Sequence, residues 1–163
     1  EKVIDENRLL LLELTPYFAD IKRISASRVV EELKMAIEEI GAKRLAIDPV
    51  APLIVRSKEP MAQEFAQAYI RDYLRGIFRG LEDLGVTTVV TSEIPTGSGA
   101  LSRYGVEEFL ASGVIVLMLR RVEMSFRREM YIRKMRGINH PMNVYPFVIL
   151  RGKGIVIPIL TSG

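Results

Sequence analysis

The chain has 163 residues, of which 48% are hydrophobic and 26% are charged, and its formal net charge is +3. This length and composition predict one soluble globular domain with a hydrophobic core. The absence of cysteine excludes disulfides and thiolate metal sites, and one histidine argues against a histidine-based metal centre. No apolar run approaches the roughly 18 residues that span a membrane, and no secretory signal is evident, so we expect a cytoplasmic protein without a membrane partner.

The first half of the chain is expected to alternate strands and helices. Residues 8–14, RLLLLEL, form a continuous apolar run typical of a strand buried on both faces. A helix is expected from a cap at Ser25 or Ser27 to a stop at Gly41. Its expected apolar stripe consists of Val30, Leu33, Ile37 and Ile40.

Two further strands, over residues 44–48 and 86–93, should be buried and should flank a helix over residues 61–84. The expected inner stripe of that helix consists of Phe65, Tyr69, Tyr73, Ile77, Leu81 and Leu84. Its expected outer stripe consists of Arg71, Arg75 and Arg79. The alternation of strand and helix predicts a parallel sheet.

The second half of the chain is expected to be mostly β. A loop over residues 94–105, IPTGSGALSRYG, is long enough to be functional or mobile. A short helix over 106–111 then precedes a hairpin of strands at 113–122 and 127–135, and YPFVIL and GIVIPIL are read as two closing strands. The predicted fold class is therefore α/β, a mostly parallel core with flanking helices and an antiparallel C-terminal extension.

Polar residues end two of the predicted parallel strands, which is where ligands bind in open α/β sheets. Asp48 follows RLAI and could hold Mg²⁺ through water beside a triphosphate. Thr91, Ser92 and Glu93 end the next strand and could sense a phosphate or a water. The alternatives are an Asp-Pro turn and ordinary polar strand ends.

The segment from Arg120 to Arg136 is strongly basic, with seven arginines and lysines opposed by Glu123 and Glu129. On a strand, Lys134 and Arg136 would share one face, and a glycine turn and His140 follow. Such a group could surround phosphate oxygens, because arginine offers a bidentate fork and lysine a point charge. The alternative is a solvated basic hairpin.

The sequence contains no phosphate cradle of the form G-x-x-x-x-G-K-[ST]. The run from Gly152 to Gly154 lacks both the upstream glycine and the hydroxyl residue. The sequence therefore contains polar strand ends that could take part in catalysis, but it contains no recognisable motif that binds the phosphates of a nucleotide.

Several stretches together resemble the KaiC-like branch of the RecA-superfamily ATPases. They are SRYGVEEFLASGVIVLMLRR at 102–121, KMRGINH at 134–140 and YPFVI at 145–149. RLAIDP is similar to that family's Walker B strand, and TTVVTSE to its next core strand. The resemblance implies a RecA-like P-loop NTPase core, of which residues 1–163 form a partial domain. The family's Walker A loop and catalytic glutamates precede the position matching Glu1, so residues 1–163 alone are not expected to hydrolyse ATP.

The resemblance also implies the ligands ATP and Mg²⁺ and a homo-oligomeric ring, usually a hexamer, with ATP at the subunit seams. Asp48 would organise Mg²⁺ through water, and Lys134 and Arg136 would act catalytically in trans on the neighbour's phosphates. Thr91 and Glu93 are candidate sensors. The implied nucleotide-binding residues are Lys134, Met135, Arg136, Ile138, His140, Leu150 and Arg151.

Two other functions stay open at this point. One is a non-catalytic signalling or scaffold protein that binds nucleotide to set its assembly. The other is a recombinase-like DNA-binding paralogue whose 94–105 loop contacts nucleic acid, although that loop offers only Arg103 and Tyr104 for phosphates and bases. Residues upstream of Glu1 would discriminate these readings from an active ATPase.

Overall fold

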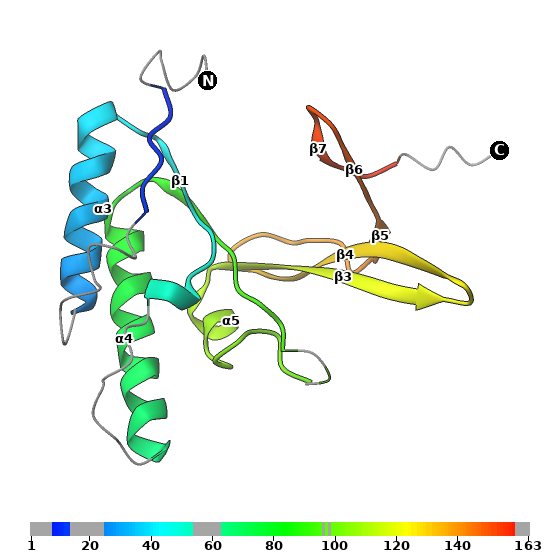
Figure 1. Cartoon of the computed structure of the whole chain (residues 1–163), viewed down its shortest axis with the longest axis horizontal. Helices are drawn as coiled ribbons and strands as arrows, with labels where there is room; N and C mark the ends of the chain where they lie inside the picture. The colour runs from blue at the N-terminus through cyan, green and yellow to red at the C-terminus, as the bar shows by residue number, and fades with distance from the viewer. Residues whose placement is uncertain (1–7, 14–24, 54–62, 96, 98, 159–163) are drawn as a thin grey trace. The chain divides into compact units, whose positions relative to one another are not determined.

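The computed structural model describes residues 8–13, 25–53, 63–95, 97 and 99–158 (Figure 1). The chain divides into two compact units, Glu1–Leu110 and Ala111–Gly163, here called the first unit and the second unit. The elements of the first unit are α3 (Ala26–Ile40), β1 (Arg44–Ile47), the 3-10 helix η1 (Ala51–Leu53), α4 (Gln63–Asp83), β2 (Thr87–Val90) and α5 (Glu107–Leu110). The elements of the second unit are β3 (Gly113–Val122), β4 (Ser125–Met135), β5 (Tyr145–Pro146), β6 (Val148–Leu150) and β7 (Gly154–Val156).

Helix α3 has the ends that its sequence predicts. At its start, the Ser25 hydroxyl accepts a hydrogen bond from the Arg28 amide at 3.3 Å. At its end, Gly41 has a φ of 61°, and its amide donates to the Glu38 carbonyl while the Ala42 amide donates to the Ile37 carbonyl. A left-handed residue with these two bonds satisfies carbonyls that the helix leaves open. The expected cap and glycine stop are confirmed.

Strands β1 and β2 pair in parallel, with Arg44 opposite Thr87 and Ile47 opposite Val90. Helix α4 connects them, as the alternating pattern predicts. The expectation that both strands are buried is wrong, and β2 ends at Val90 although the predicted strand extends to Glu93. Ile47 is buried, whereas Ala46 is exposed and Val89 is 61% exposed. The burial alternates because, among the described residues, one face of this pair packs on the core and the other face is open to solvent.

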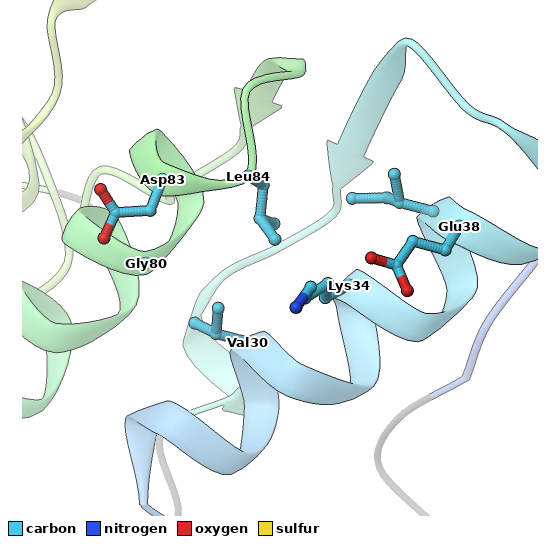
Figure 2. A pocket seen from close by; sticks show the side chains of 7 residues that line it. Val30, Lys34, Glu38, Gly80, Asp83 and Leu84 are labelled. Carbon is cyan, nitrogen blue, oxygen red and sulfur yellow. The ribbon is translucent and has the colours of Figure 1, made fainter.

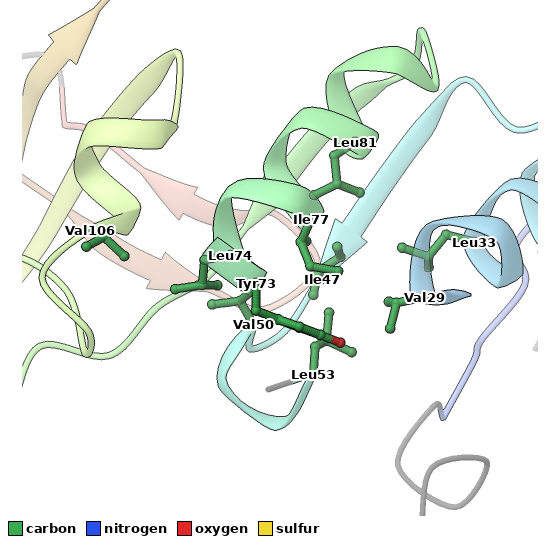
Figure 3. Packing of buried hydrophobic residues seen from close by; sticks show 10 residues of the cluster. All are labelled: Val29, Leu33, Ile47, Val50, Leu53, Tyr73, Leu74, Ile77, Leu81 and Val106. Carbon is green, nitrogen blue, oxygen red and sulfur yellow. The ribbon is translucent and has the colours of Figure 1, made fainter. Parts of the chain in front are cut away.

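The core of the first unit forms where α3 and α4 pack beside β1 and the segment that follows it (Figure 3). Its buried members are Val29, Leu33, Ile47, Val50, Leu53, Tyr73, Leu74, Ile77, Leu81 and Val106. The predicted stripe of α4 is confirmed at Tyr73, Ile77 and Leu81. The side chain of Phe65 lies outside the described residues. Two fully buried residues, Val29 and Leu74, were not in the predicted stripes, because the contact between two helices covers a wider arc than one row.

A glycine allows α3 and α4 to approach closely. A Cβ built on Gly80 of α4 would lie 2.9 Å from Cγ1 of Val30 and closer still to its Cγ2. The Cβ of Val30 would itself lie 3.1 Å away, so rotation of the Val30 side chain would relieve only part of the contact. Gly80 therefore sits inside a helix despite its poor helix propensity because the helix contact requires it.

Strands β3 and β4 form the predicted antiparallel hairpin, which turns at Glu123 and Met124. Val114 lies opposite Lys134 and Ile115 opposite Ile132, so Arg133 is an extra residue that forms a β-bulge. Strand β4 starts at Ser125, two residues before the predicted start, and ends at Met135. Arg136 follows in a turn, so strand alternation does not place its side chain on the same face as that of Lys134.

Two expected strands differ from the structure. The stretch YPFVIL is divided between β5, which pairs with β4, and β6, which pairs with β7. Residues 8–13 belong to no strand, and Leu14 lies outside the described residues. Leu11 is 72% exposed. An apolar run becomes a strand only when a neighbouring strand pairs with it, and the described residues provide no partner for this run.

The close approach at Gly80 predicts an unusual response to substitution. Gly80→Ala in a helix normally stabilises a protein by about 1 kcal/mol. Here we expect it to destabilise the fold by about 1–3 kcal/mol, because the added methyl overlaps the Val30 side chain. Urea unfolding measures the change.

The double variant tests the cause. In a Val30→Ala background only the 3.1 Å contact with the Cβ of residue 30 remains, so Gly80→Ala should destabilise much less than in the unmodified chain. A stabilising effect of Gly80→Ala in the unmodified chain would contradict the described contact between α3 and α4.

Candidate functional site

The polar ends of β1 and β2 are joined by one residue. The Thr91 hydroxyl donates to Oδ1 of Asp48 at 2.6 Å. The Thr91 amide donates to the Ile47 carbonyl at 2.9 Å, and the Thr91 carbonyl accepts from the Val50 amide at 3.0 Å. Thr91 thus binds the chain before, at and after Asp48. The structure brings together two of the predicted site residues, Asp48 and Thr91.

The surroundings of Asp48 fit a magnesium ion held through water. Its side chain is exposed, and Oδ2 has no hydrogen-bond donor among the described residues. Carboxylate oxygens are the ligands that Mg²⁺ prefers, and in phosphate sites Mg²⁺ keeps several waters and uses one or two carboxylates. Within the described part of the chain, no group of three or more acidic or histidine side chains could hold a metal. The site therefore suits a hydrated metal shared with phosphates and does not form an all-protein cage.

Glu93, the other candidate sensor, has a different contact. Its carboxylate accepts from the Arg103 guanidinium at 2.7 Å, across the base of the 94–105 loop. Both side chains are largely exposed, at 63% and 44%. An exposed pair of this kind contributes at most about 1 kcal/mol. Thr91 thus donates a hydrogen bond to the candidate metal ligand, whereas Glu93 forms an ion pair with a residue of the loop.

A buried carboxylate that the sequence analysis did not single out organises the region after β2. Glu107, at the start of α5, is 5% exposed. Its Oε1 accepts from the Ser92 hydroxyl at 3.0 Å, and its Oε2 accepts from the Ser102 hydroxyl at 2.8 Å. The Val106 amide donates to Oε2 at 3.1 Å, and the Tyr104 amide lies 3.3 Å from both oxygens. One side chain therefore binds the end of β2, the end of the loop and the start of α5.

These contacts decide the protonation of Glu107. Burial alone would raise the pKa of its carboxyl group, because a low-dielectric surrounding disfavours the charge. Hydrogen bonds from its own amide, Ser102, Val106 and Ser92 outweigh that effect, and the pKa is lowered. Glu107 is therefore a buried anion at neutral pH.

A weak signal of this cluster exists in the sequence. Ser92 and Ser102 are placed at the two ends of a glycine-rich loop, and the glutamate follows within five residues of the second serine. Serine and glutamate at a helix start commonly satisfy open amides. Nothing in the spacing shows that both serines reach the same carboxylate, because that depends on how the loop folds back.

The predicted phosphate-binding segment lies at the end of the hairpin in the second unit. Lys134 and Met135 are half-buried residues at the end of β4. Arg136 is exposed in the following turn, and its amide donates to the Ser112 carbonyl at 2.9 Å. Gly137 has a φ of 73°, a conformation that favours glycine, and Ile138 is 67% exposed. This turn carries an arginine and an apolar side chain that are open to solvent.

The remaining predicted residues also belong to the second unit. His140 is half-buried, and its Nδ1 lies 3.3 Å from the Pro141 carbonyl oxygen. Leu150 is 43% exposed at the end of β6, and Arg151 is exposed in the turn to β7. The Asp48–Thr91 pair belongs to the first unit. The predicted site thus consists of two groups of residues, one in each unit.

A hollow of about 300 Å³ lies between α3 and α4 and contains none of the predicted site residues (Figure 2). It is lined by Val30, Lys34, Ile37, Glu38, Gly80, Asp83 and Leu84. Two carboxylates and one ammonium group give this hollow a net negative lining. It does not suit a polyphosphate, which requires an excess of cationic or amide donors.

Comparison with known proteins identifies the family. The family described as "ATPase: KaiC" matches residues 1–161, nearly the whole chain. The chain belongs to the KaiC ATPase family. Its fold class, an α/β RecA-like P-loop NTPase core with parallel and antiparallel strands, is confirmed by this match and by a solved structure. That structure, a KaiC-like protein from Pyrococcus horikoshii, has a TM-score of 0.75 and 34% identity, and the match covers 96% of this chain and 63% of that chain.

Two curated relatives carry the name circadian clock oscillator protein KaiC. The protein from Prochlorococcus marinus is 32% identical over 162 residues, which are 96% of this chain and 30% of that protein. The protein from Synechococcus elongatus is 31% identical over 151 residues, which are 91% of this chain and 28% of that protein. The chain therefore spans less than a third of the length of these KaiC relatives. No helix in the described ranges is long and apolar enough to cross a membrane.

The lowered pKa of Glu107 predicts a pH-dependent contribution to stability. Glu107→Gln should lower the free energy of unfolding by about 1–3 kcal/mol at neutral pH, because an amide nitrogen cannot accept the bonds that a carboxylate oxygen accepts. The ionised form is favoured in the folded state, so its contribution is present above the unfolded pKa of about 4.3 and is lost as the pH falls through the lower folded value.

Urea unfolding of both forms between pH 3 and pH 7 tests this prediction. The difference between them should be largest near neutral pH and should shrink below about pH 4.3. Glu39→Gln, at an exposed position on α3, is the control and should change little. A difference that grows as the pH falls would contradict the buried anion.

Proposed function

We propose that this KaiC-family chain is part of an ATPase that binds ATP with Mg²⁺ at the interfaces between the subunits of a homo-oligomeric ring. Each active site would then be shared by two subunits. The observation that carries the proposal is the Asp48–Thr91 pair. A carboxylate at the end of a parallel strand, oriented by a hydroxyl from the neighbouring strand, stands where open α/β folds bind ligands.

In this proposal Asp48 holds the metal through water and Thr91 fixes the carboxylate. The Thr91 hydroxyl donates to Oδ1, so Oδ2 would accept from a water bound to the metal. Bound Mg²⁺ would supply positive charge that stabilises the phosphates. The exposed position of Asp48 is consistent with this role, because a hydrated metal and a triphosphate need room.

The basic segment of the second unit supplies the charges for the phosphates of a neighbouring subunit. Arg136 is exposed and its planar fork suits the oxygens of a transferred phosphoryl group, so it would stabilise the charge that develops there. Lys134 would add a second positive charge. His140, Met135 and Ile138 would line the nucleotide, and Leu150 and Arg151 would contact its base or ribose.

An exposed apolar face on the hairpin supports assembly into an oligomer. Ile115, Leu117 and Leu119 alternate along β3 and are 54%, 47% and 63% exposed. Phe126 of β4, opposite Arg121, is 67% exposed. Contiguous apolar surface of this kind marks interaction sites on folded proteins. A ring in which each hairpin faces a neighbouring subunit would remove this surface from water.

The loop over residues 94–105 gives little support to nucleic-acid binding. Its one basic residue in the sequence, Arg103, makes an ion pair with Glu93. Proteins that follow a nucleic-acid backbone use several cations and stacked aromatic rings. The ATPase is therefore the better-supported function, and a scaffold that binds nucleotide without turnover is an outcome of the experiments that follow.

The first experiment substitutes the metal carboxylate in the complete protein. Asp48→Asn keeps the shape and the acceptor for Thr91 but removes the charge. Magnesium-dependent ATP hydrolysis should fall by orders of magnitude while circular dichroism stays unchanged. Asp83→Asn, at an exposed position on α4, is the matched control and should remain active. Near-normal hydrolysis by Asp48→Asn would rule out the metal role, and hydrolysis absent from the unmodified protein would favour the scaffold.

The second experiment tests whether active sites are shared between subunits. In the complete protein, Arg136→Ala should abolish hydrolysis and leave much of the ATP binding. Mixing this subunit with one disabled in the Walker A segment should partly restore activity, because some seams then combine two intact halves. Arg133→Ala, at the exposed bulge of β4, is the control and should stay active. Confirmed mixing without recovered hydrolysis would defeat the shared site.

A further inference from the structure

Two consecutive residues at the end of β2 belong to two different hydrogen-bond groups. Thr91 binds Asp48 and the backbone of residues 47 and 50, as described above. Ser92, the next residue, donates to the buried carboxylate of Glu107 and accepts from the Arg103 amide at 3.4 Å. Because one peptide bond joins these residues, the position of Ser92 restricts where the Thr91 hydroxyl can lie.

Of the two sets of hydrogen bonds, the set around Glu107 is better shielded from water than the set around Asp48. Glu107 and Ser102 are buried, whereas Asp48 and Thr91 are exposed. Strand β2 ends at Val90, and the described residues between Thr91 and α5 form no strand pairing that would hold the chain. Hydrogen bonds shielded from water open less readily than exposed ones. The buried carboxylate thus gives the residues after β2 an attachment that is shielded from water.

We propose that Glu107 is a positioning residue for the candidate metal carboxylate: through Ser92 it fixes the end of β2, and so holds the Thr91 hydroxyl on Asp48. The effect on metal binding rests on the proposed function, but the effect on Thr91 and Asp48 does not. Glu107 touches neither metal nor nucleotide in this scheme.

Two serines allow the proposal to be tested without removing the carboxylate. Ser92→Ala deletes the hydroxyl that links Glu107 to β2. Ser102→Ala deletes a hydroxyl on the same carboxylate, but from the loop side. Both variants remove one hydroxyl from Glu107 and differ in the segment that is released. Ser92→Ala also removes the acceptor of the Arg103 amide, and Ser102→Ala also removes a donor to the Glu108 carboxylate. Glu107→Gln is the stronger perturbation. If the Glu107→Gln protein fails to fold, the two serine variants still test whether Glu107 positions Thr91.

Amide hydrogen exchange of the complete protein without nucleotide gives the first readout. The Thr91 and Val50 amides close the bonds between the two strand ends, and the Thr87 amide donates to the Lys43 carbonyl at the other end of the same strands. Ser92→Ala should speed exchange at Thr91 and Val50 about tenfold, as expected for the loss of one hydrogen bond, and leave Thr87 unchanged. Ser102→Ala should affect the Tyr104 and Val106 amides instead.

Two exchange results would overturn the proposal. In one, Ser92→Ala leaves Thr91 and Val50 protected, which would mean that Glu107 only closes the loop. In the other, both serine variants loosen Thr91 equally, which would mean that the carboxylate stabilises the unit in general.

The magnesium dependence of ATP hydrolysis gives the second readout. Ser92→Ala should raise the Mg²⁺ concentration for half-maximal rate by about tenfold, the lower range for residues that orient a metal ligand, while Ser102→Ala should not. An unchanged magnesium dependence alongside faster exchange at Thr91 would overturn the link to the metal. If the unmodified protein shows no magnesium-dependent ATP binding, the proposed function fails, and the exchange experiment still decides whether Glu107 positions Thr91 and Asp48.

Discussion

The first unit depends on three hydrogen bonds made by a single threonine. Thr91 uses its amide, carbonyl and hydroxyl on residues 47, 50 and 48, so the turn after β1 is shaped around the end of β2. Parallel strands leave their carboxyl ends without ladder partners, and buried or half-buried backbone groups there need other partners. A threonine at this position satisfies the backbone and orients a carboxylate with the same residue.

In that arrangement the same carboxylate, that of Asp48, contributes to the stability of the turn and to the proposed function. The Asp48 carboxylate accepts a bond that helps to hold the turn, and the same carboxylate is the candidate metal ligand. The neighbouring Glu107 group has a different character. It is buried, ionised and surrounded by donors, which is how a charge becomes tolerable away from water. An exposed carboxylate, the candidate metal ligand, and a buried structural carboxylate thus bind two consecutive residues after β2.

Local features of the sequence predicted much of the fold. The ends of α3 follow from Ser25 and Gly41, whose effects act within a few residues. The parallel pair of β1 and β2 and the hairpin of β3 and β4 follow from their apolar runs. The apolar run at residues 8–13 failed as a strand because pairing is decided by a partner that the run itself does not specify. The same reason explains the exposed Val89, since burial of the second face depends on what covers the sheet.

The candidate site was predicted less evenly. Asp48 and Thr91 could be found because strand ends of a parallel sheet meet at one edge, and the structure joins them. Lys134, Arg136 and His140 were singled out by their charge and spacing, and Met135, Ile138, Leu150 and Arg151 by resemblance to a family. The described contacts leave the role of all of them a proposal. Glu107 was missed because its partners are separated by up to fifteen residues and meet only after the loop folds back.

The bulge at Arg133 means that chain length near the basic segment matters as much as residue type. One residue of β4 has no paired residue on β3, so the register of the residues after it is shifted by one position. Each residue beyond the bulge, Lys134 first among them, takes the side of the hairpin that this displacement assigns. If the pairing continued without a bulge, Arg133 would lie opposite Val114 and Lys134 opposite Gly113, so these two basic side chains would exchange faces of the hairpin. The extra residue in β4 therefore decides which of the two basic side chains each face of the hairpin presents.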